Sequence, residues 1–289
     1  MKVHKKWDPL LFLALPLLAY SLVVFLPIFF SVFYSFMSWT GISRMRFIGL
    51  DNFKRMFSDN VLFTVLMNSL RFTIAGTILQ IGGGLVLAIL VLQLKRGQNL
   101  TRVLLFTPVV ISSMAMSQTF RQLLSINPDG VLNSVLGFIG LAHLKVAFLA
   151  DMNLTLWVVA AVDSYRFCGL YLVIFYAAFI AIDTEIIEAA TIDGAKGWQL
   201  YTYIRLPIIR GIIVSSTILV VTGTLKAFDT PFILTNGGPG SSSELLALYM
   251  YKTAFNSMEF GYASALSLLV VFLCVSSFTI INKLTKQYD

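Results

Sequence analysis

Residues 188–207 read Glu-Ala-Ala-Thr-Ile-Asp-Gly-Ala-Lys-Gly-Trp-Gln-Leu-Tyr-Thr-Tyr-Ile-Arg-Leu-Pro, and this stretch decides how the rest of the chain is interpreted. It is polar enough for water, although long apolar runs flank it on both sides. Asp183 is a favourable helix cap, and acidic side chains in the first turns suit the positive end of the helix dipole. Gly194 and Gly197 disfavour one long helix, so we expect two short helices that meet at a glycine elbow. Pro207 is expected in the first turn of the next helix, where its missing N–H would be unpaired anyway.

The composition is that of an integral membrane protein. Of the 289 residues, 57% are apolar and 12% are charged, and the mean hydropathy is +0.83. Soluble domains carry about 25% charged residues. The apolar runs leave no room for a separate soluble domain, so residues 1–289 are expected to form a single transmembrane domain. The net charge of +7 comes without a dense basic run, so we interpret it as orienting the chain in a lipid bilayer rather than as binding nucleic acid.

The cysteines and histidines give no sign of a metal site. Cys168 and Cys274 both lie in apolar runs, where an isolated cysteine is more often a small packing residue than half of a disulfide. His4 and His143 are far apart and have no neighbours at metal-ligand spacing. We therefore expect no metal and no catalytic residue in this chain.

Six apolar runs are long enough to cross a bilayer as helices, which takes about 20 residues. The sequence therefore predicts an all-α integral membrane protein with six transmembrane helices, and a turn-rich loop at 121–152 between the third and the fourth. The expected spans are 10–36, 72–94, 103–120, 153–182, 208–234 and 260–282.

The distribution of Lys and Arg predicts the orientation, because loops rich in these residues stay in the cytoplasm. This rule puts both termini and the 188–207 stretch in the cytoplasm. The loops expected on that side carry Lys2, Lys5, Lys6, Lys95, Arg96, Arg102, Lys196, Arg205, Arg210, Lys283 and Lys286. The opposite side has fewer, namely Arg44, Arg46, Lys54, Arg55, Lys145 and Lys252.

Two pairs of opposite charges lie inside the expected spans. Asp163 and Arg166 are three residues apart and so share one helix face, and Lys226 and Asp229 repeat this spacing. Ionisable residues within the membrane usually face a bundle interior or a wet cavity. Each pair either borders a polar cavity or neutralises itself and holds helices together, and the sequence leaves both interpretations open.

The 188–207 stretch resembles the EAA loop of ABC-importer permeases through Glu188-Ala-Ala, Asp193-Gly-Ala and Leu206-Pro. The resemblance implies that residues 183–207 form cytoplasmic coupling helices, which dock into a groove on an ATPase subunit. Tyr201 stands where the family often has Phe, and it keeps the aromatic ring. The residues expected to couple to the ATPase are Glu188, Ala189, Ala190, Asp193, Gly194, Ala195, Tyr201, Leu206 and Pro207.

Further segments resemble carbohydrate-uptake permeases of the maltose and multiple-sugar type. They are 49–53 (Gly-Leu-Asp-Asn-Phe), 228–229, 234–239, 251–255 and 261–265. The resemblance covers nearly the whole chain and implies the type I ABC-importer permease fold. In that family the helices before and after the EAA loop contact the substrate, which corresponds to 165–170 and 223–227 here. The residues expected along the substrate path are Asp163, Tyr165, Arg166, Phe167, Gly169, Leu170, Gly223, Thr224, Lys226 and Ala227.

The resemblance implies a permease subunit of a binding-protein-dependent ABC importer for carbohydrate, an oligosaccharide, in the bacterial cytoplasmic membrane. The chain has no Walker-type Gly-x-x-x-x-Gly-Lys-Ser/Thr sequence. We therefore expect it to bind no cofactor and to work with two ATPase subunits that hold ATP with Mg²⁺. A second homologous permease and an extracytoplasmic solute-binding protein complete the expected assembly.

Three alternatives differ in what they require. An ion-driven secondary transporter predicts internal inverted repeats, and the sequence shows no clear repeat. A membrane enzyme needs a convergent catalytic constellation, whereas only scattered charges are present. An importer for glycerol phosphate or a polyol keeps the same architecture, and Arg166 or Lys226 would then meet the phosphate.

Overall fold

The computed structural model describes residues 8–286, and Lys2, His4, Lys5 and Lys6 lie outside them. The chain divides into two compact units, each of which is described by itself. The first consists of residues 1–59 and 250–271, and the second of residues 60–249 and 272–289.

The first unit holds an apolar helix and a small sheet. The helix runs through α1 (Asp8–Tyr20), the π-helical turn η1 (Ser21–Phe25) and α2 (Leu26–Ser35). Strands β1 (Met37–Ser38) and β2 (Arg46–Phe47) pair antiparallel, with Met37 opposite Phe47, and α3 (Asp51–Ser58) follows. The unit also contains the end of α14 (Leu246–Phe255) and the start of α15 (Phe260–Lys286).

Asn52, in the short motif at 49–53, ties this unit together. Its buried amide donates hydrogen bonds to the carbonyl oxygens of Ser35 (2.8 Å) and Met37 (3.0 Å). Gly261 allows α15 to pass close by, because a Cβ there would lie 2.0 Å from the Met37 carbonyl oxygen. The Asn and the glycine of the two family-like segments are thus packing residues here.

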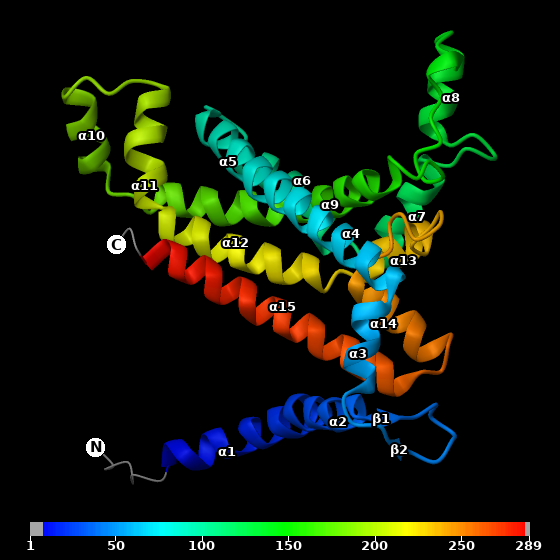
Figure 1. Cartoon of the computed structure of the whole chain (residues 1–289). Coiled ribbons are helices and arrows are strands. Elements are labelled where there is room, and N and C mark those ends of the chain that lie inside the picture. Colours follow the sequence, from blue (N-terminus) through cyan, green and yellow to red (C-terminus); the bar gives the residue numbers. More distant parts are fainter. Residues whose placement is uncertain (1–7, 287–289) are drawn as a thin grey trace. The chain divides into compact units, whose positions relative to one another are not determined.

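The second unit is a bundle of helices around α9 (Figure 1). Before α9 come α4 (Asn60–Thr77), η2 (Ile78–Gly82), α5 (Gly83–Gln93), α6 (Gln98–Val110), α7 (Ser113–Leu123), α8 (Val131–Phe138) and η3 (Ala142–Leu144). From α9 (Thr155–Ile180) the chain continues through α10 (Thr184–Ile192), η4 (Leu200–Arg205), α11 (Leu206–Ile208), α12 (Arg210–Leu225) and α13 (Asp229–Thr235).

Small residues let the helices approach α9 closely. A Cβ at Gly169 would lie 2.0 Å from the Leu105 carbonyl oxygen on α6, and one at Gly84 would lie 2.7 Å from the Cβ of Tyr171. Phe72 on α4 and Phe175 on α9 are fully buried in the two apolar clusters that result. Close approach of backbones at glycine is the usual way in which helices associate in a membrane.

The candidate membrane spans match the six predicted runs, with three corrections. Within the described residues 8–286, four helices are long and apolar enough to cross a bilayer: Leu13–Ser35, Asn60–Gln93, Thr155–Ile180 and Phe260–Thr285. Two more spans are present if each of two bent helix pairs counts as one. The second span is longer than predicted, because the helix begins at Asn60 and carries Arg71 within it rather than starting after that charge.

The third and fifth predicted spans are broken rather than straight. A bend of 94° separates Gln98–Val110 from Ser113–Leu123, and one of 69° separates Leu200–Ile208 from Arg210–Leu225. Pro108 and Pro207 lie shortly before these bends, but proline crowds the turn that precedes it, so neither proline by itself explains a bend on its C-terminal side. The fifth helix also ends at Leu225, so α13 is a separate element.

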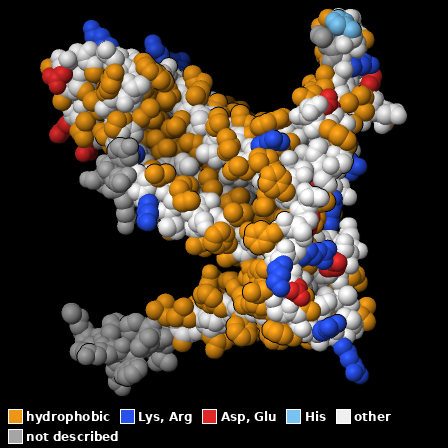
Figure 2. Space-filling model, in the orientation of Figure 1, with side chains coloured by type: hydrophobic (Ala, Val, Ile, Leu, Met, Phe, Trp, Pro, Cys, Tyr) orange, Lys and Arg blue, Asp and Glu red, His pale blue; other side chains and the backbone are white. Residues whose placement is uncertain are grey.

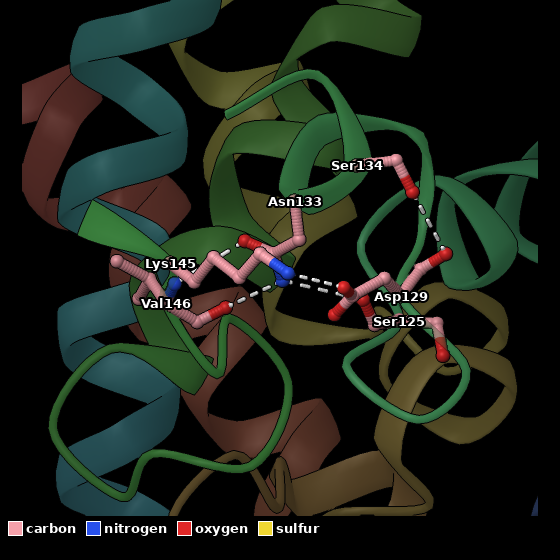
Figure 3. A network of polar contacts seen from close by, with 6 residues as sticks. All are labelled: Ser125, Asp129, Asn133, Ser134, Lys145 and Val146. Carbon is pink, nitrogen blue, oxygen red and sulfur yellow. Dashed lines mark hydrogen bonds and ion pairs between the residues drawn. The ribbon is translucent and has the colours of Figure 1, made fainter. Parts of the chain in front are cut away.

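The predicted loop 121–152 is partly ordered as helix, because α8 and η3 lie within it. The buried Asn133 holds this lobe by donating to the carbonyl oxygens of Val146 (3.1 Å) and Ser125 (3.4 Å) and accepting from the Val146 N–H (3.2 Å) (Figure 3). Lys145 and Asp129 form an ion pair beside it. The amide nitrogen and oxygen of the buried Asn133 both have hydrogen-bond partners. These bonds explain why this turn-rich segment adopts a fixed shape.

Much of the visible surface is apolar (Figure 2). Large side chains such as Val23 and Phe29 on the first helix and Phe63 and Ile78 on the second are more than half exposed. Contiguous apolar surface of this extent on long helices suits contact with lipid rather than water.

Candidate functional site

The residues predicted to couple to an ATPase form a helix–elbow–helix at one end of α9 and α12 (Figure 1). Helix α10 ends at Ile192, and Gly194 follows with φ +94°. The Gly194 N–H donates to the Thr191 carbonyl oxygen and the Ala195 N–H to that of Ala190, the hydrogen-bond pattern of a Schellman cap. Gly197 also has a positive φ, of +52°. The predicted glycine elbow is confirmed.

One side of this segment is exposed and the other packs on the bundle. Glu188, Ala189, Asp193, Gly194 and Pro207 are exposed, whereas Ala190, Ala195 and Leu206 are half-buried. Glu188 forms no ion pair with any residue that the structure describes. The small and acidic residues thus leave a surface open to another molecule.

Tyr201 differs from the other predicted coupling residues because its ring lies inside the protein. It is 8% exposed and meets the Phe179 ring on α9 edge to face, with the ring centroids 6.1 Å apart. Trp198, three residues earlier, is 67% exposed. Of these two aromatic side chains, Trp198 is therefore the one available to a partner, and Tyr201 anchors the segment to α9.

Pro207 is not in the first turn of the next membrane helix, contrary to the prediction. It lies in α11, which continues the turn η4, and α12 starts only at Arg210 after the 69° bend. A Leu-Pro pair is compatible with either the start or the end of a helix. Only the bend at Ile209 shows that this pair lies before α12 and not in its first turn.

A cavity of about 300 Å³ lies between α9, α12 and α13. Its size is at the lower end for small-molecule sites, which span about 300–1,000 Å³. The side chains around it are polar, charged and aromatic as well as apolar. They are Gln80, Asp163, Arg166, Phe167, Leu170, Tyr171, Leu219, Val220, Gly223, Thr224, Lys226, Ala227, Phe228, Asp229 and Thr230.

Both acids of the cavity accept hydrogen bonds from hydroxyl groups. Thr230 on α13 donates to Asp163 Oδ1 (2.8 Å), and Ser113 on α7 donates to Asp229 Oδ2 (2.6 Å). These bonds join α13 to α9 and to α7. Charged hydrogen bonds of this kind are stronger than neutral ones.

The two charge pairs expected from the sequence do not form as such. Asp163 and Arg166 share α9, yet no direct ion pair joins them, and the Arg166 guanidinium lies 4.8 Å from the centre of the Phe167 ring. Lys226 and Asp229 are not on one helix, because Lys226 caps the end of α12 and Asp229 begins α13. Neither pair forms a direct ion pair among the described residues, although Arg166 attracts the Asp163 carboxylate, and all four residues border the cavity.

All the residues predicted along the substrate path line this cavity except Tyr165 and Gly169. Those two border a separate, mainly apolar cavity beside α6, together with Cys168. Gly169 is the contact point with α6 described above. Every third or fourth residue of a helix shares a face, so a continuous window such as 165–170 necessarily includes side chains that point elsewhere.

Seven residues of the lining were not among the predicted path residues: Gln80, Tyr171, Leu219, Val220, Phe228, Asp229 and Thr230. Gln80 could have been identified from the sequence, since it is an amide in an otherwise apolar run, and the structure buries it. Thr230 could not have been identified in this way, because a threonine near a helix start is usually a local capping residue.

No group of three His, Cys, Asp or Glu side chains within residues 8–286 is arranged to hold a metal ion. Cys168 and Cys274 are both free thiols. The residues that line the cavity offer charge, hydrogen-bonding groups and aromatic rings for recognition of a ligand.

Comparison with known proteins gives related chains of similar length. The probable ABC transporter permease protein YurN of Bacillus subtilis is 34% identical over 277 residues, which is 94% of each chain. The multiple sugar-binding transport system permease protein MsmF of Streptococcus mutans is 31% identical over 100% of this chain and 98% of its own. The lactose transport system permease protein LacF of Rhizobium radiobacter is 31% identical over 91% and 89%.

A solved structure of a bacterial ABC transporter that imports the acidic polysaccharide alginate contains a chain with the same fold. Its TM-score is 0.84 at 19% identity, covering 98% of this chain and 97% of the other. A structure of a bacterial alginate ABC transporter in complex with an alginate pentasaccharide-bound periplasmic protein also contains a chain that matches with a TM-score of 0.84 at 19% identity.

The predicted resemblance to ABC-importer permeases is confirmed by these relatives, and the fold agrees. Residues 80–288 match the family model for the inner membrane component of binding-protein-dependent transport systems. This match includes the coupling segment and every residue that lines the cavity. The chain therefore belongs to the family of binding-protein-dependent transport system inner membrane components.

Proposed function

We propose that this chain forms half of the translocation path of a bacterial importer for carbohydrate, an oligosaccharide, and couples that path to a cytoplasmic ATPase through residues 183–207. The observation that carries the proposal is the joint presence of an exposed glycine-elbow segment and a cavity, both built on α9 and α12. Relatives named for multiple sugars and for lactose support a carbohydrate cargo.

The cavity has the chemistry of a saccharide site. Its lining includes the aromatic residues Phe167, Tyr171 and Phe228, a residue type that suits the apolar C–H side of a sugar ring, together with the amide of Gln80 and the hydroxyl of Thr224. Sites for small polar ligands combine apolar walls with a few placed polar groups in this way.

The rest of the machinery lies in other subunits under this proposal. ATP with Mg²⁺ is hydrolysed by two ATPase subunits, and this chain is a transport component and not an enzyme. A second, homologous permease closes the path, and an extracytoplasmic solute-binding protein delivers the cargo. Both termini and residues 183–207 face the cytoplasm, so residues 1–289 act as one permease domain with its coupling loop inside the cell.

The mechanism follows from the connection between the two regions. When ATP closes the ATPase pair, the docked segment 183–207 moves with it and pulls on α9 through the contact of Tyr201 with Phe179. Helix α9 carries Asp163 and Arg166, so the same movement changes the walls of the cavity. The path then opens to the outside, where the solute-binding protein stands.

The test is affinity purification of the chain, solubilised gently from its native membrane and cross-linked, with identification of the proteins that accompany it. We expect a second six-helix permease and an ATPase with a Walker sequence. Recovery of the chain alone, followed by ion-driven uptake by this chain alone in liposomes, would overturn the proposal in favour of a secondary transporter.

A further inference from the structure

The cavity between α9, α12 and α13 contains two acids and two cations, and these differ in how far the protein itself engages them. The acids are held by hydroxyl groups, since Asp163 is 6% exposed and accepts from Thr230, and Asp229 accepts from Ser113. These carboxylates join helices, and Asp163 presents little surface to a ligand.

Arg166 is not engaged in the same way. Its Nε is buried and has no hydrogen-bond partner among the residues that the structure describes, and its guanidinium lies over the Phe167 ring and attracts the Asp163 carboxylate without forming an ion pair with it. Native proteins rarely leave a buried donor unpaired, so such a group calls for an acceptor that is absent from the free protein.

Lys226 is the second cation at the cavity, and no hydrogen bond or ion pair holds its ammonium group within the described chain. Its position at the end of α12 gives it some stabilisation from the helix dipole. That explanation does not extend to Arg166, which lies in the interior of α9. Two cations from different helices are thus directed to one space.

We propose that the cargo of this cavity is a saccharide that carries an anionic group, a carboxylate or a phosphate, held by Arg166 and Lys226. A guanidinium binds planar oxyanions through parallel N–H donors, and an ammonium group adds a point charge. The half-buried aromatic residues Phe167 and Phe228 bind the sugar ring. The inference rests on the proposed carbohydrate function and narrows its substrate class.

The experiment measures direct binding to the purified permease–ATPase complex without nucleotide, so that selection by the solute-binding protein does not enter. Three probes of equal length are compared: a neutral glucose trisaccharide, the same trisaccharide with one terminal ring oxidised at C6 to the uronic acid, and its terminal 6-phosphate. We expect at least one anionic probe to bind more tightly than the neutral one by roughly tenfold to a hundredfold, the range of one charged hydrogen bond.

Variants separate a charge effect from a change of shape. Arg166→Gln should abolish the preference for the anionic probes over the neutral one, and Lys226→Gln should reduce that preference. Arg166→Lys should retain part of it, because the charge remains. Arg121→Gln is the matched control, since Arg121 lies on α7 outside this cavity and contacts the Ile233 carbonyl oxygen, and it should keep the full preference.

The outcomes are distinct. Binding of the neutral probe as tightly as both anionic ones, or a preference that survives in Arg166→Gln, overturns this inference and leaves the carbohydrate importer in place. Failure of all three probes to bind contradicts both. A preference for the phosphate over the uronic acid, or the reverse, identifies which anion the cargo carries.

Discussion

The proposed coupling segment 183–207 and the proposed substrate cavity are built in opposite ways. The segment is one continuous, mainly exposed stretch, and its shape follows from local rules such as the left-handed Gly194 at the end of α10. The cavity gathers residues from Gln80 to Thr230, and its charged groups are held by hydrogen bonds between helices far apart in the chain. Local chemistry makes the docking surface, and tertiary packing makes the binding site.

Helices α9 and α12 connect the two regions. Helix α9 carries Asp163 at the cavity and Phe179 beside Tyr201, and these positions lie about 24 Å apart at 1.5 Å per residue. A rigid helix between two sites transmits displacement only if it stays packed on its neighbours. The difference between the regions therefore predicts three kinds of mutational effect: on the shared helix, on the segment, and on the cavity.

The largest effect is expected from Gly169→Leu on the shared helix. The new Cβ would lie 2.0 Å from the Leu105 carbonyl oxygen, a backbone atom that no side-chain movement can relieve. We expect α6 to separate from α9 and the chain to be lost from the membrane, as measured by immunoblot and by size-exclusion chromatography in detergent.

Gly211→Leu is the matched control, because Gly211 lies exposed on α12 and a Cβ added there would have no heavy atom within 4 Å. Normal amounts of monodisperse Gly169→Leu protein would show that α6 and α9 do not need their close contact. The transmission of movement along α9 would then lose its structural basis.

The second effect is confined to the segment. Gly194→Val places a β-branched side chain at φ +94°, which strains the backbone by roughly 1–3 kcal/mol but meets no neighbour within 4 Å. We expect the protein to insert normally and ATP-driven uptake to fall by more than about tenfold, because a displaced elbow no longer presents Glu188 correctly.

Gly140→Val tests whether strain alone is responsible. Gly140 follows α8 with φ +80°, also has open space around it, and lies far from residues 183–207 in the sequence. Its variant should retain uptake near the unaltered level. Equal loss of uptake in both variants would show that backbone strain anywhere in the chain impairs transport, and the special role of the elbow would fail.

The features that the sequence can predict are the local ones, and those that it cannot predict depend on tertiary packing. The elbow at Gly194 and Gly197, the length of α9 and the membrane runs were predictable, because each depends on neighbours in the sequence. The bends near Pro108 and Pro207 were not predictable from the sequence, since proline is compatible with either a helix start or a kink. One of the two interpretations that the sequence left open paired Asp163 and Asp229 with the nearest cations, but their hydrogen-bond partners are hydroxyl groups from other helices. Only packing decides which groups from distant segments meet.

The smallest effect is expected at the cavity, from Thr230→Val. This change keeps the shape of the side chain but removes the hydroxyl that donates to Asp163 at 2.8 Å. It leaves a buried carboxylate without that donor, which lowers stability by about 1–3 kcal/mol. The midpoint of thermal unfolding in detergent should fall by several degrees, and uptake should persist.

Thr222→Val is the comparison that gives this result meaning. The Thr222 hydroxyl donates only within its own helix, to the carbonyl oxygens of Ile218 (2.8 Å) and Leu219 (3.2 Å), which keep their backbone partners after the change. Its loss should shift the midpoint by less than the loss at Thr230. If the two variants unfold at the same temperature, the bond from α13 to α9 does not stabilise the cavity, and the walls must be held by apolar packing alone. A lower midpoint for Thr230→Val alone instead places the stabilising interaction between helices, which is the feature that distinguishes the cavity from the coupling segment.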